Sequence, residues 1–325
     1  MMQLAEFFTS QPDRLWALAK QMGIDYAVGP LPWETRGEQP WDLMPLIRMK
    51  QRYADHGLEL TVIESMPPSN RIKLGLPGRE EEIETMQKLI VNMGAAGIPV
   101  LCYNFMAQMG WFRTSTTTRT RGGALVSSYD HSLMAGAPLT EAGVVGETQL
   151  WENLHAFLEQ IVPVAEQAGV RLALHPDDPP ISPIRGVSRI LRDADSLERA
   201  INLVPSANSG ITLCQGTLAT AGESVPAVIR RFASTEKLFF VHFRDVRGTA
   251  DKFAETFHDD GMTDMYEAMK TYVEVGYAGP ARPDHVPTME GEDNANPGYE
   301  LLGRLFGVGY IKGLMEAAGK ERIVD

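Results

Sequence analysis

The sequence predicts an α/β fold, a (β/α)8 TIM barrel that forms one domain over residues 1–325. Three observations predict it. Short apolar runs alternate with amphipathic segments along the whole chain, no break in composition divides the chain, and five amphipathic segments end in a glycine that directly precedes a strand-like run. A glycine just past a helix adopts the left-handed conformation that closes the last turn. The five glycines are Gly23, Gly57, Gly97, Gly169 and Gly276.

Eight strands are expected, each followed by a helix or by a long loop and then a helix. The helical period is clear before Gly97, where Ile83, Met86 and Ile90 share one face. A doubly wound sheet is the alternative fold, but it requires a glycine-rich phosphate turn after the first strand, and the turn that starts at Phe8 has no glycine. The expected strands are Met2–Phe8, Asp25–Val28, Leu58–Glu64, Val100–Asn104, Arg171–His175, Gly210–Cys214, Leu238–Arg244 and Gly279–Pro283.

One segment, residues 105–147, breaks this rhythm. It contains no convincing helix and is rich in Thr, Arg, Gly and Ser, although Trp111 and Leu125 argue against disorder. A segment of this length without secondary structure in a compact domain is typical of a lid, a binding loop or a subunit-contact arm. We therefore expect a long loop insertion after the fourth strand, and we expect the protein to form a homo-oligomer.

The composition excludes several classes of partner. Of the 325 residues, 44% are hydrophobic and 22% are charged, which is enough to bury a large core. The net charge of −12 argues against nucleic acid and against an anionic membrane, because both require a basic face. Two cysteines are too few for a disulfide framework, the first residues show no signal peptide, and no apolar run approaches membrane-spanning length. We expect a cytoplasmic protein that acts on a small molecule.

A buried strand ends abruptly in chemically active residues at His175. The apolar run Leu172–Leu174 is followed by His175, Pro176 and two aspartates. Proline has no backbone N–H for a sheet, so the strand must end near His175. In α/β barrels the carboxyl ends of the strands carry the chemistry. Alone, this histidine is equally well interpreted as a hydrogen-bonded residue at a strand end.

Three later strands end in residues of the same chemical kind as His175. They are Cys214, His242 and Asp284, and in a barrel all four would converge on one mouth. Each has a structural alternative: a buried small hydrophobe, a core histidine or a helix cap. Imidazole, thiolate and carboxylate are ordinary ligands of divalent transition metals, and their recurrence at four successive strand ends favours a metal site. The ligand types admit manganese, iron(II) or zinc.

With these residues located, the chain resembles the mannonate dehydratase family, metal-dependent TIM barrels of the xylose-isomerase-like type that act in sugar-acid catabolism. The resemblance runs from about Leu58 to Ala318. It rests on these motifs: Thr61-Val62-Ile63-Glu64-Ser65, Gly94-Ala95-Ala96-Gly97-Ile98-Pro99-Val100, Cys102-Tyr103-Asn104-Phe105-Met106, Leu174-His175-Pro176-Asp177-Asp178-Pro179-Pro180, Leu213-Cys214-Gln215-Gly216, Phe253-Ala254-Glu255-Thr256, His258, Asp264-Met265-Tyr266, Arg282-Pro283-Asp284-His285 and Pro297-Gly298-Tyr299.

The resemblance implies dehydration of D-mannonate to 2-keto-3-deoxy-D-gluconate. It also implies a site for Mn²⁺, with Fe²⁺ or Zn²⁺ as alternatives, held by the four residues named above, and it places Tyr299 near the chemistry. The chain departs from the family pattern at Gly110, where the family has an aspartate, and at Val286, where it has a glycine. These departures lie around the substrate and not among the ligands, so a closely related aldonate is the alternative substrate.

Dehydration of an aldonic acid requires charge stabilisation, a base and an acid. A metal would supply the first. Tyr299 and His285 are the acid and base candidates, and a tyrosine base would need its pKa lowered from about 10. Asp284 is also a possible base, but we assign it to the metal first. The candidates for binding the substrate are Arg244, His258, Asn104 and Arg113, and we expect Asp177 and Asp178 to orient His175.

Two other functions remain open from the residues. One is a metal-dependent sugar isomerase or epimerase, because such barrels also stabilise enediolates. The other is a non-catalytic paralogue that binds sugar acids without turning them over.

Overall fold

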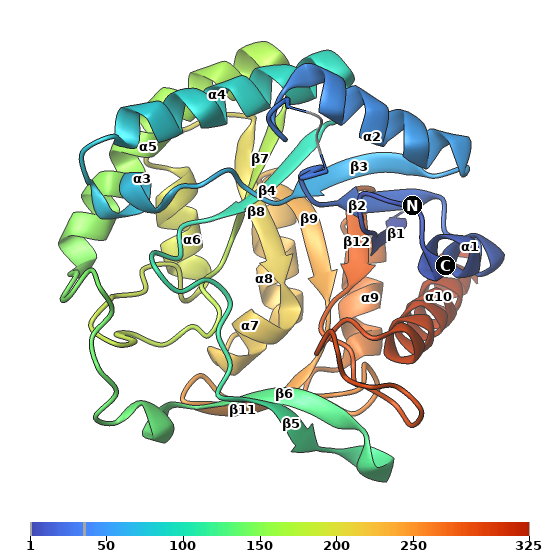
Figure 1. Cartoon of the computed structure of the whole chain (residues 1–325). Helices are drawn as coiled ribbons and strands as arrows, with labels where there is room; N and C mark the ends of the chain where they lie inside the picture. The colour runs from blue at the N-terminus through green and yellow to red at the C-terminus, as the bar shows by residue number, and fades with distance from the viewer. Residues whose placement is uncertain (1, 35–36, 325) are drawn as a thin grey trace.

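The structure is a computed structural model that describes residues 2–34 and 37–324. Eight parallel strands close into a barrel in the order β1-β12-β9-β8-β7-β4-β3-β2 (Figure 1). The expected barrel is therefore confirmed, and every expected strand occurs, with ends that differ by at most one residue. The barrel strands are β1 (Gln3–Phe7), β2 (Tyr26–Gly29), β3 (Glu59–Glu64), β4 (Val100–Asn104), β7 (Arg171–His175), β8 (Ser209–Cys214), β9 (Leu238–Phe243) and β12 (Pro280–Pro283).

Helices surround the barrel, and local sequence fixes where they begin and end. The side chains of Asp13, Asp193 and Asp264 each accept a hydrogen bond from a free backbone N–H in the first turn of a helix. The five glycines predicted to close helices all have φ between 66° and 75°. None of the described helices is long and apolar enough to cross a membrane. The helices are α1 (Arg14–Gln21), α2 (Leu43–Asp55), α3 (Asn70–Leu74), α4 (Arg79–Ala96), α5 (Glu147–Ala168), α6 (Ala194–Ile201), α7 (Gln215–Thr220), α8 (Val225–Ala233), α9 (Met265–Glu274) and α10 (Leu301–Val324).

Two buried clusters make up the core. The larger lies between the strands and the surrounding helices, and includes Leu89, Ile90, Leu154 and Ile161. The smaller one fills the inside of the barrel with side chains such as Val28, Val62, Val100, Ala173 and Phe240. Because the barrel interior is packed and is not a pore, a ligand can bind only at an end, where the strands give way to loops.

The expected insertion after the fourth strand is present, but the expectation that residues 105–147 lack regular structure is wrong. The segment contains β5 (Ser115–Arg119) and β6 (Leu125–Asp130), which pair as an antiparallel hairpin. A second hairpin, β10 (Val246–Thr249) and β11 (Lys252–Glu255), follows β9, and β11 pairs with β6. The resulting four-stranded sheet, hereafter the accessory sheet, lies below the barrel strands in Figure 1.

Candidate metal centre and active-site cavity

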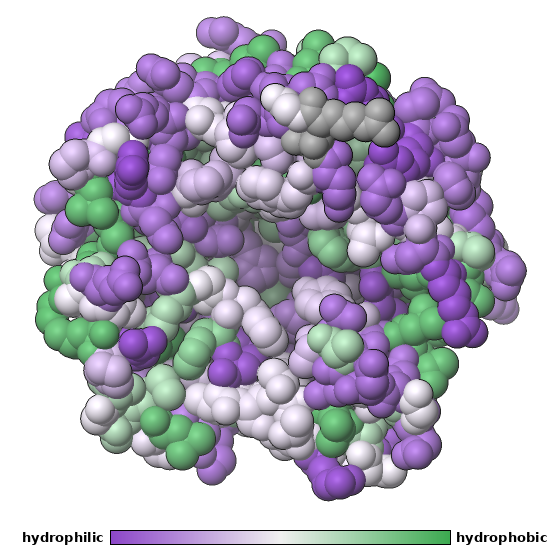
Figure 2. Space-filling model, in the orientation of Figure 1, coloured by the Kyte–Doolittle hydropathy of each residue, from purple (hydrophilic) through white to green (hydrophobic). Residues whose placement is uncertain are grey.

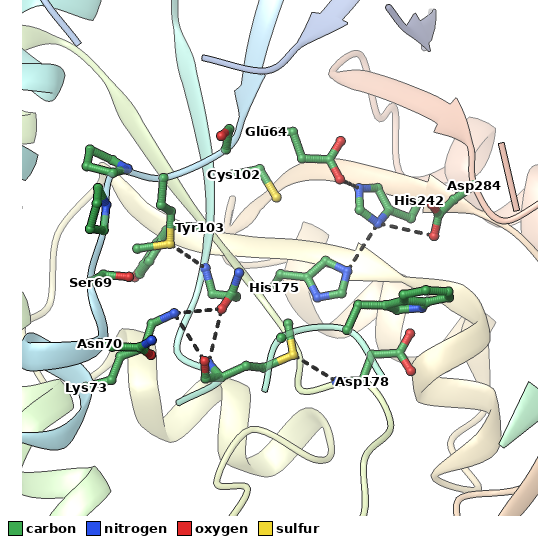
Figure 3. Close-up of a pocket in the computed structure, with 18 of the residues that line it drawn as sticks. Glu64, Ser69, Asn70, Lys73, Cys102, Tyr103, His175, Asp178, His242 and Asp284 are labelled. Carbon is green, nitrogen blue, oxygen red and sulfur yellow. Dashed lines mark hydrogen bonds and ion pairs between the residues drawn. The ribbon is translucent and has the colours of Figure 1, made fainter. Parts of the chain in front are cut away.

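A cavity of about 730 Å³ lies at the carboxyl ends of the barrel strands. Figure 2 shows the hollow at the centre of this face of the molecule. One side is formed by the segment from Glu64 to Lys73, and another by residues near Trp111. His175, His242 and Asp284 also line it, and Figure 3 shows them grouped at one end. The volume is that of an ordinary small-molecule site.

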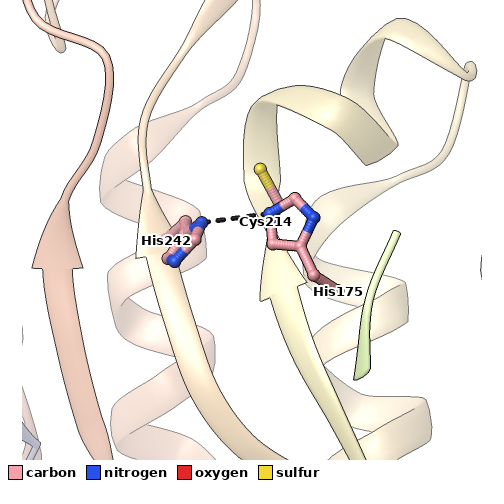
Figure 4. A group of neighbouring side chains, drawn as sticks. All are labelled: His175, Cys214 and His242. Carbon is pink, nitrogen blue, oxygen red and sulfur yellow. Dashed lines mark hydrogen bonds between the residues drawn. The ribbon is translucent and has the colours of Figure 1, made fainter. Parts of the chain in front are cut away.

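His175, Cys214 and His242 come together at the ends of β7, β8 and β9 (Figure 4). Their potential ligand atoms all lie within 4.8 Å of one another. His175 Nε2 is 3.2 Å from His242 Nδ1, and His175 Nδ1 is held by the carbonyl oxygen of Pro176 at 2.6 Å. Donor atoms that share one ion, each about 2.0–2.3 Å from it, must be spaced on this order. The three side chains can therefore hold a single ion.

Asp284 lies beside this group, just past the end of β12. Its Oδ2 is 3.6 Å from His242 Nδ1. The Nε of Arg244 lies between the acid and the thiol, 3.2 Å from Asp284 Oδ2 and 3.2 Å from Cys214 Sγ. The structure thus brings together all four residues that the sequence predicts as ligands.

The surrounding charges keep the thiol and the acid in their anionic forms. Burial alone would raise the pKa of Cys214, but the Arg244 guanidinium and hydrogen bonds with His175 and His242 hold it well below its ordinary value. Burial would also raise the pKa of Asp284, but the neighbouring His285 and Arg282 side chains hold it well below its usual range. A deprotonated thiol and an ionised carboxylate are the forms that bind a metal.

Glu64, at the end of β3, holds the far side of His242. Its Oε1 is 3.1 Å from His242 Nε2, and both of its oxygens accept hydrogen bonds from Arg282, at 2.6 and 2.8 Å. Burial raises the pKa of Glu64, but Arg282 and His242 together lower it to about 2. A carboxylate on the second ring nitrogen fixes the tautomer and orientation of a metal-binding histidine, so His242 Nδ1 is left for an ion.

A second group, Glu64, Cys102 and His242, also has its ligand atoms within 4.8 Å of one another. It suits a cation less well. Burial and the nearby Glu64 raise the pKa of Cys102 well above its ordinary value, which keeps the thiol protonated. Glu64 is already paired with Arg282. The donor chemistry of His175, Cys214, His242 and Asp284 therefore fits a divalent metal better than this second set.

Tyr299 and His285, the acid and base candidates, both line the cavity next to Asp284. The Tyr299 hydroxyl donates a hydrogen bond to Asp284 Oδ1 at 3.0 Å, and His285 Nε2 is 3.6 Å from the same oxygen. Burial and the Asp284 charge raise the pKa of Tyr299 well above its ordinary value. The direction is opposite to the one that a tyrosine base needs, so the protein alone keeps this hydroxyl protonated.

Of the four substrate-binding candidates, only Asn104 lines the cavity. Arg113 and Arg244 are buried behind it, and their guanidinium groups are bound to the carboxylates of Asp178 and Glu255, at 2.5 to 2.9 Å. The ring of His258 donates to the Phe243 carbonyl oxygen at 2.8 Å, away from the cavity. Both arginines are bound within internal ion pairs, and the partners in these pairs could not be identified from the sequence.

The expectation that Asp177 and Asp178 orient His175 is wrong. Asp177 Oδ2 accepts hydrogen bonds from the backbone N–H groups of Ile190 and Leu191, and so fixes the loop after β7. Asp178 pairs with Arg113 and Arg244. The partner of His175 is its own neighbouring carbonyl, that of Pro176.

Sequence reasoning did not select three residues that shape the site. Glu64 and Arg282 form the ion pair behind His242, and Lys73 lines the cavity from α3. Glu64 could have been found, because it ends the third strand as His175 ends the fifth. Lys73 could not have been found in this way, because it lies on the short helix α3 and not at the end of a strand.

Fold and site together define a barrel enzyme with a metal-ligand cluster at the carboxyl ends of its strands. The profile of the D-mannonate dehydratase (UxuA) family matches residues 6–142 and 139–324. The chain is 37% identical to the mannonate dehydratase of Thermotoga neapolitana, over 92% of each chain, and 36% identical to that of Streptococcus pneumoniae, over 87% of this chain and 85% of the relative. The protein belongs to the mannonate dehydratase family, a family of hydro-lyases.

Solved structures agree with this assignment. The crystal structure of mannonate dehydratase from Streptococcus suis serotype 2 superimposes with a TM-score of 0.92 at 34% identity, covering 99% of this chain and 94% of that one. An L-ribulose 3-epimerase matches with a TM-score of 0.65 at 16% identity, over 100% of this chain and 98% of that one. The epimerase match shows the shared barrel fold and nothing about the reaction.

Proposed function

We propose that the protein dehydrates D-mannonate to 2-keto-3-deoxy-D-gluconate, using a divalent metal held by His175, Cys214, His242 and Asp284. The observation that carries the proposal is that His175, His242 and Asp284 line one cavity with Tyr299 and His285, with Cys214 next to the two histidines, in a mannonate dehydratase family member. A bound ion would supply Lewis-acid stabilisation of negative charge on the substrate oxygens.

The residues of the chain would divide the remaining work between a base and an acid. His285 lines the cavity and takes the proton from the carbon beside the carboxylate. Tyr299, whose hydroxyl already acts as a donor, gives a proton to the hydroxyl that leaves the next carbon as water. The enol that results becomes the 2-keto acid. The carboxylate of Glu255 lies 3.3 Å from His285 Nδ1, where it would favour the ring after the proton has been taken up.

Arg244 is proposed to act through the ligands and not on the substrate. Its Nε faces both Cys214 Sγ and Asp284 Oδ2, and its terminal nitrogens are held by Glu255 and Asp178. A fixed guanidinium in this position favours the anionic state of the two ligands before an ion arrives.

The test is turnover of D-mannonate by the purified protein loaded with Mn²⁺, read as a product lighter by one water. We expect Tyr299→Phe to lower kcat by about 100-fold or more, because one proton donor is lost, with metal content unchanged. Tyr310→Phe, outside the cavity lining, is the matched control and should keep the wild-type kcat. Interconversion of an aldose and a ketose without formation of a 2-keto-3-deoxy acid would contradict the proposal.

The alternative of a sugar isomerase or epimerase has support from the shared fold alone. The family assignment favours the dehydratase over both this alternative and a non-catalytic paralogue. The identity of the metal as Mn²⁺, the cytoplasmic location, the single domain over residues 1–325 and the homo-oligomeric state stay predictions from the sequence.

A further inference from the structure

Lys73 is a buried cation at the cavity whose charge is not neutralised by a neighbouring carboxylate. The residue is 6% exposed, and among the described residues its Nζ makes no ion pair with an Asp or Glu. Burial lowers the pKa of Lys73 to about 8, against the attraction of the more distant Asp177. A buried charge without a counter-charge costs free energy, so an arrangement of this kind calls for an anionic ligand.

The hydrogen bonds of Lys73 leave one donor for that ligand. Its Nζ donates to Asn104 Oδ1 at 3.0 Å and to the Met106 carbonyl oxygen at 3.3 Å (Figure 3). A lysine ammonium has three N–H groups, so one remains. Lys73 is one of the residues that line the cavity, so we infer that its third donor is available to a bound molecule.

Asn104 adds a second donor at the same place. Its Oδ1 accepts from both Lys73 Nζ and the Met106 backbone N–H, which fixes the orientation of the side-chain amide. The Nδ2 group is therefore left for a ligand. Asn104 pairs in register with His175 on the neighbouring strand, so this donor pair stands next to the proposed metal centre.

The other cationic side chain in the cavity lining, apart from the histidines, cannot take this role. Arg282 donates to Glu64 through two nitrogens and to Asp284 Oδ1 at 2.9 Å. Its charge is thus balanced within the protein. Lys73 is left as the cation of the described lining that lacks a carboxylate partner.

We propose that Lys73, together with the Asn104 amide, binds the carboxylate of the sugar-acid substrate. The inference rests on the proposed function, because it identifies the anion as the carboxylate of an aldonate. The ammonium supplies a charge-assisted hydrogen bond, and the amide supplies a second, directional donor. Lys73 and Asn104 would thereby orient the substrate, with its carboxylate at their end of the cavity.

The test measures binding without turnover, on the Mn²⁺-loaded enzyme. The probes are the 3-deoxy analogue of D-mannonate, which lacks the leaving hydroxyl, and D-mannitol, which keeps the hydroxyls but lacks the charge. We expect Lys73→Met and Lys73→Gln each to weaken binding of the acid by about 10- to 100-fold, because a hydrogen bond to a charged group is lost. Binding of D-mannitol should change less than about 3-fold.

The matched control is Lys50→Met. Like Lys73, Lys50 donates to two oxygens of the protein, in this case the carbonyl oxygens of Ala96 and Gly97, but it lies outside the cavity lining. We expect it to leave the Kd of the acid at the wild-type value. The thermal midpoint is a second readout: removal of an uncompensated buried charge should leave Lys73→Met at least as stable as the wild type.

Three results would overturn the inference: an unchanged Kd for the acid in Lys73→Met, wild-type binding in Lys73→Gln, or an equal loss for D-mannitol. The outcome is separable from the proposed function. Loss of analogue binding in a protein that does not dehydrate D-mannonate would refute the activity and keep the role of Lys73. Turnover of D-mannonate by the wild type, together with unchanged analogue binding in Lys73→Met, would support the activity and refute the role of Lys73.

Discussion

The two buried cysteines differ in the groups that surround them, and this difference predicts which of them binds a metal. Cys214 lies against two imidazoles and Arg244, which favour its thiolate. Cys102 lies near Glu64, and its raised pKa keeps its thiol protonated and neutral. We expect Cys214→Ser to lower the metal content, and to reduce activity by about 100-fold or more, because an alcohol is a poor substitute for a thiolate. Metal analysis after gel filtration and steady-state assays give the measurement.

Cys102→Ser is the matched control for that substitution. Its hydroxyl would replace a buried thiol whose Sγ accepts a hydrogen bond from Thr212 Oγ1 at 3.2 Å, and the metal content should stay at the wild-type level. The opposite pattern, with metal lost from Cys102→Ser and kept by Cys214→Ser, would place the ion at the group that contains Glu64.

Strand-end residues could be predicted from the sequence because their positions follow from the fold. Once His175, Cys214 and His242 are assigned to the ends of consecutive strands, barrel geometry alone brings them together. The function of Arg113 could not be predicted in this way. Arg113 lies outside the cavity lining because it pairs with Asp178 and Glu255, residues that are 65 and 142 positions away.

The accessory sheet is attached to the barrel by a buried ionic cluster. Arg113, just before β5, binds Asp178 beyond β7 and Glu255 at the end of β11, and every one of these side chains is 1% exposed. Loss of one partner from a buried ion pair leaves the others without full compensation. We expect Arg113→Met to lower the free energy of unfolding by about 3 kcal/mol, measured by urea denaturation.

A surface ion pair of the same sheet provides the comparison for Arg113. Arg247 on β10 pairs with Asp260 at 2.7 Å, but its side chain is 61% exposed. Arg247→Met should change the free energy of unfolding by less than about 1 kcal/mol, because solvent screens exposed pairs. Equal effects of the two substitutions would show that the buried cluster does not secure the sheet.

The barrel strands and the accessory sheet differ in how far local sequence determines them. Most barrel strands contain an apolar run, and five of them (β2, β3, β4, β7 and β12) directly follow a helix that is closed by glycine, so they can be predicted from a short window. By contrast, β5 reads Ser-Thr-Thr-Thr-Arg and has little apolar content. The sheet forms because β6 pairs with β11, more than 120 positions later, and no local pattern records such a partner.

Stability of the whole barrel should depend on pH through His258. Burial lowers the pKa of His258 to about 4, below its ordinary 6.5, and the ring contacts the Phe243 carbonyl at the end of β9. Between pH 6.5 and 4, His258 therefore binds a proton in the unfolded chain but stays neutral in the folded chain. Stability falls as the pH is lowered through this window, and His258 accounts for about 3 kcal/mol of the loss.

Denaturant titrations at pH 4 to 7 test this dependence. His258→Gln should flatten the fall relative to the wild type, since the side chain no longer titrates. His155→Gln, an exposed histidine on α5, should leave the fall unchanged. A curve for His258→Gln that runs parallel to the wild type would refute the assignment.

Closure of the barrel between β1 and β12 has a consequence for how the protein is made. The first strand leaves the ribosome early but pairs with a strand that begins at Pro280, and the proposed ligands emerge in the order His175, Cys214, His242 and Asp284. A nascent chain therefore lacks its fourth ligand until nearly nine-tenths of the polypeptide has been synthesised. If the four residues bind the metal as proposed, complete coordination is possible only after β12 has been translated. Binding of the metal to an incomplete nascent chain is therefore disfavoured.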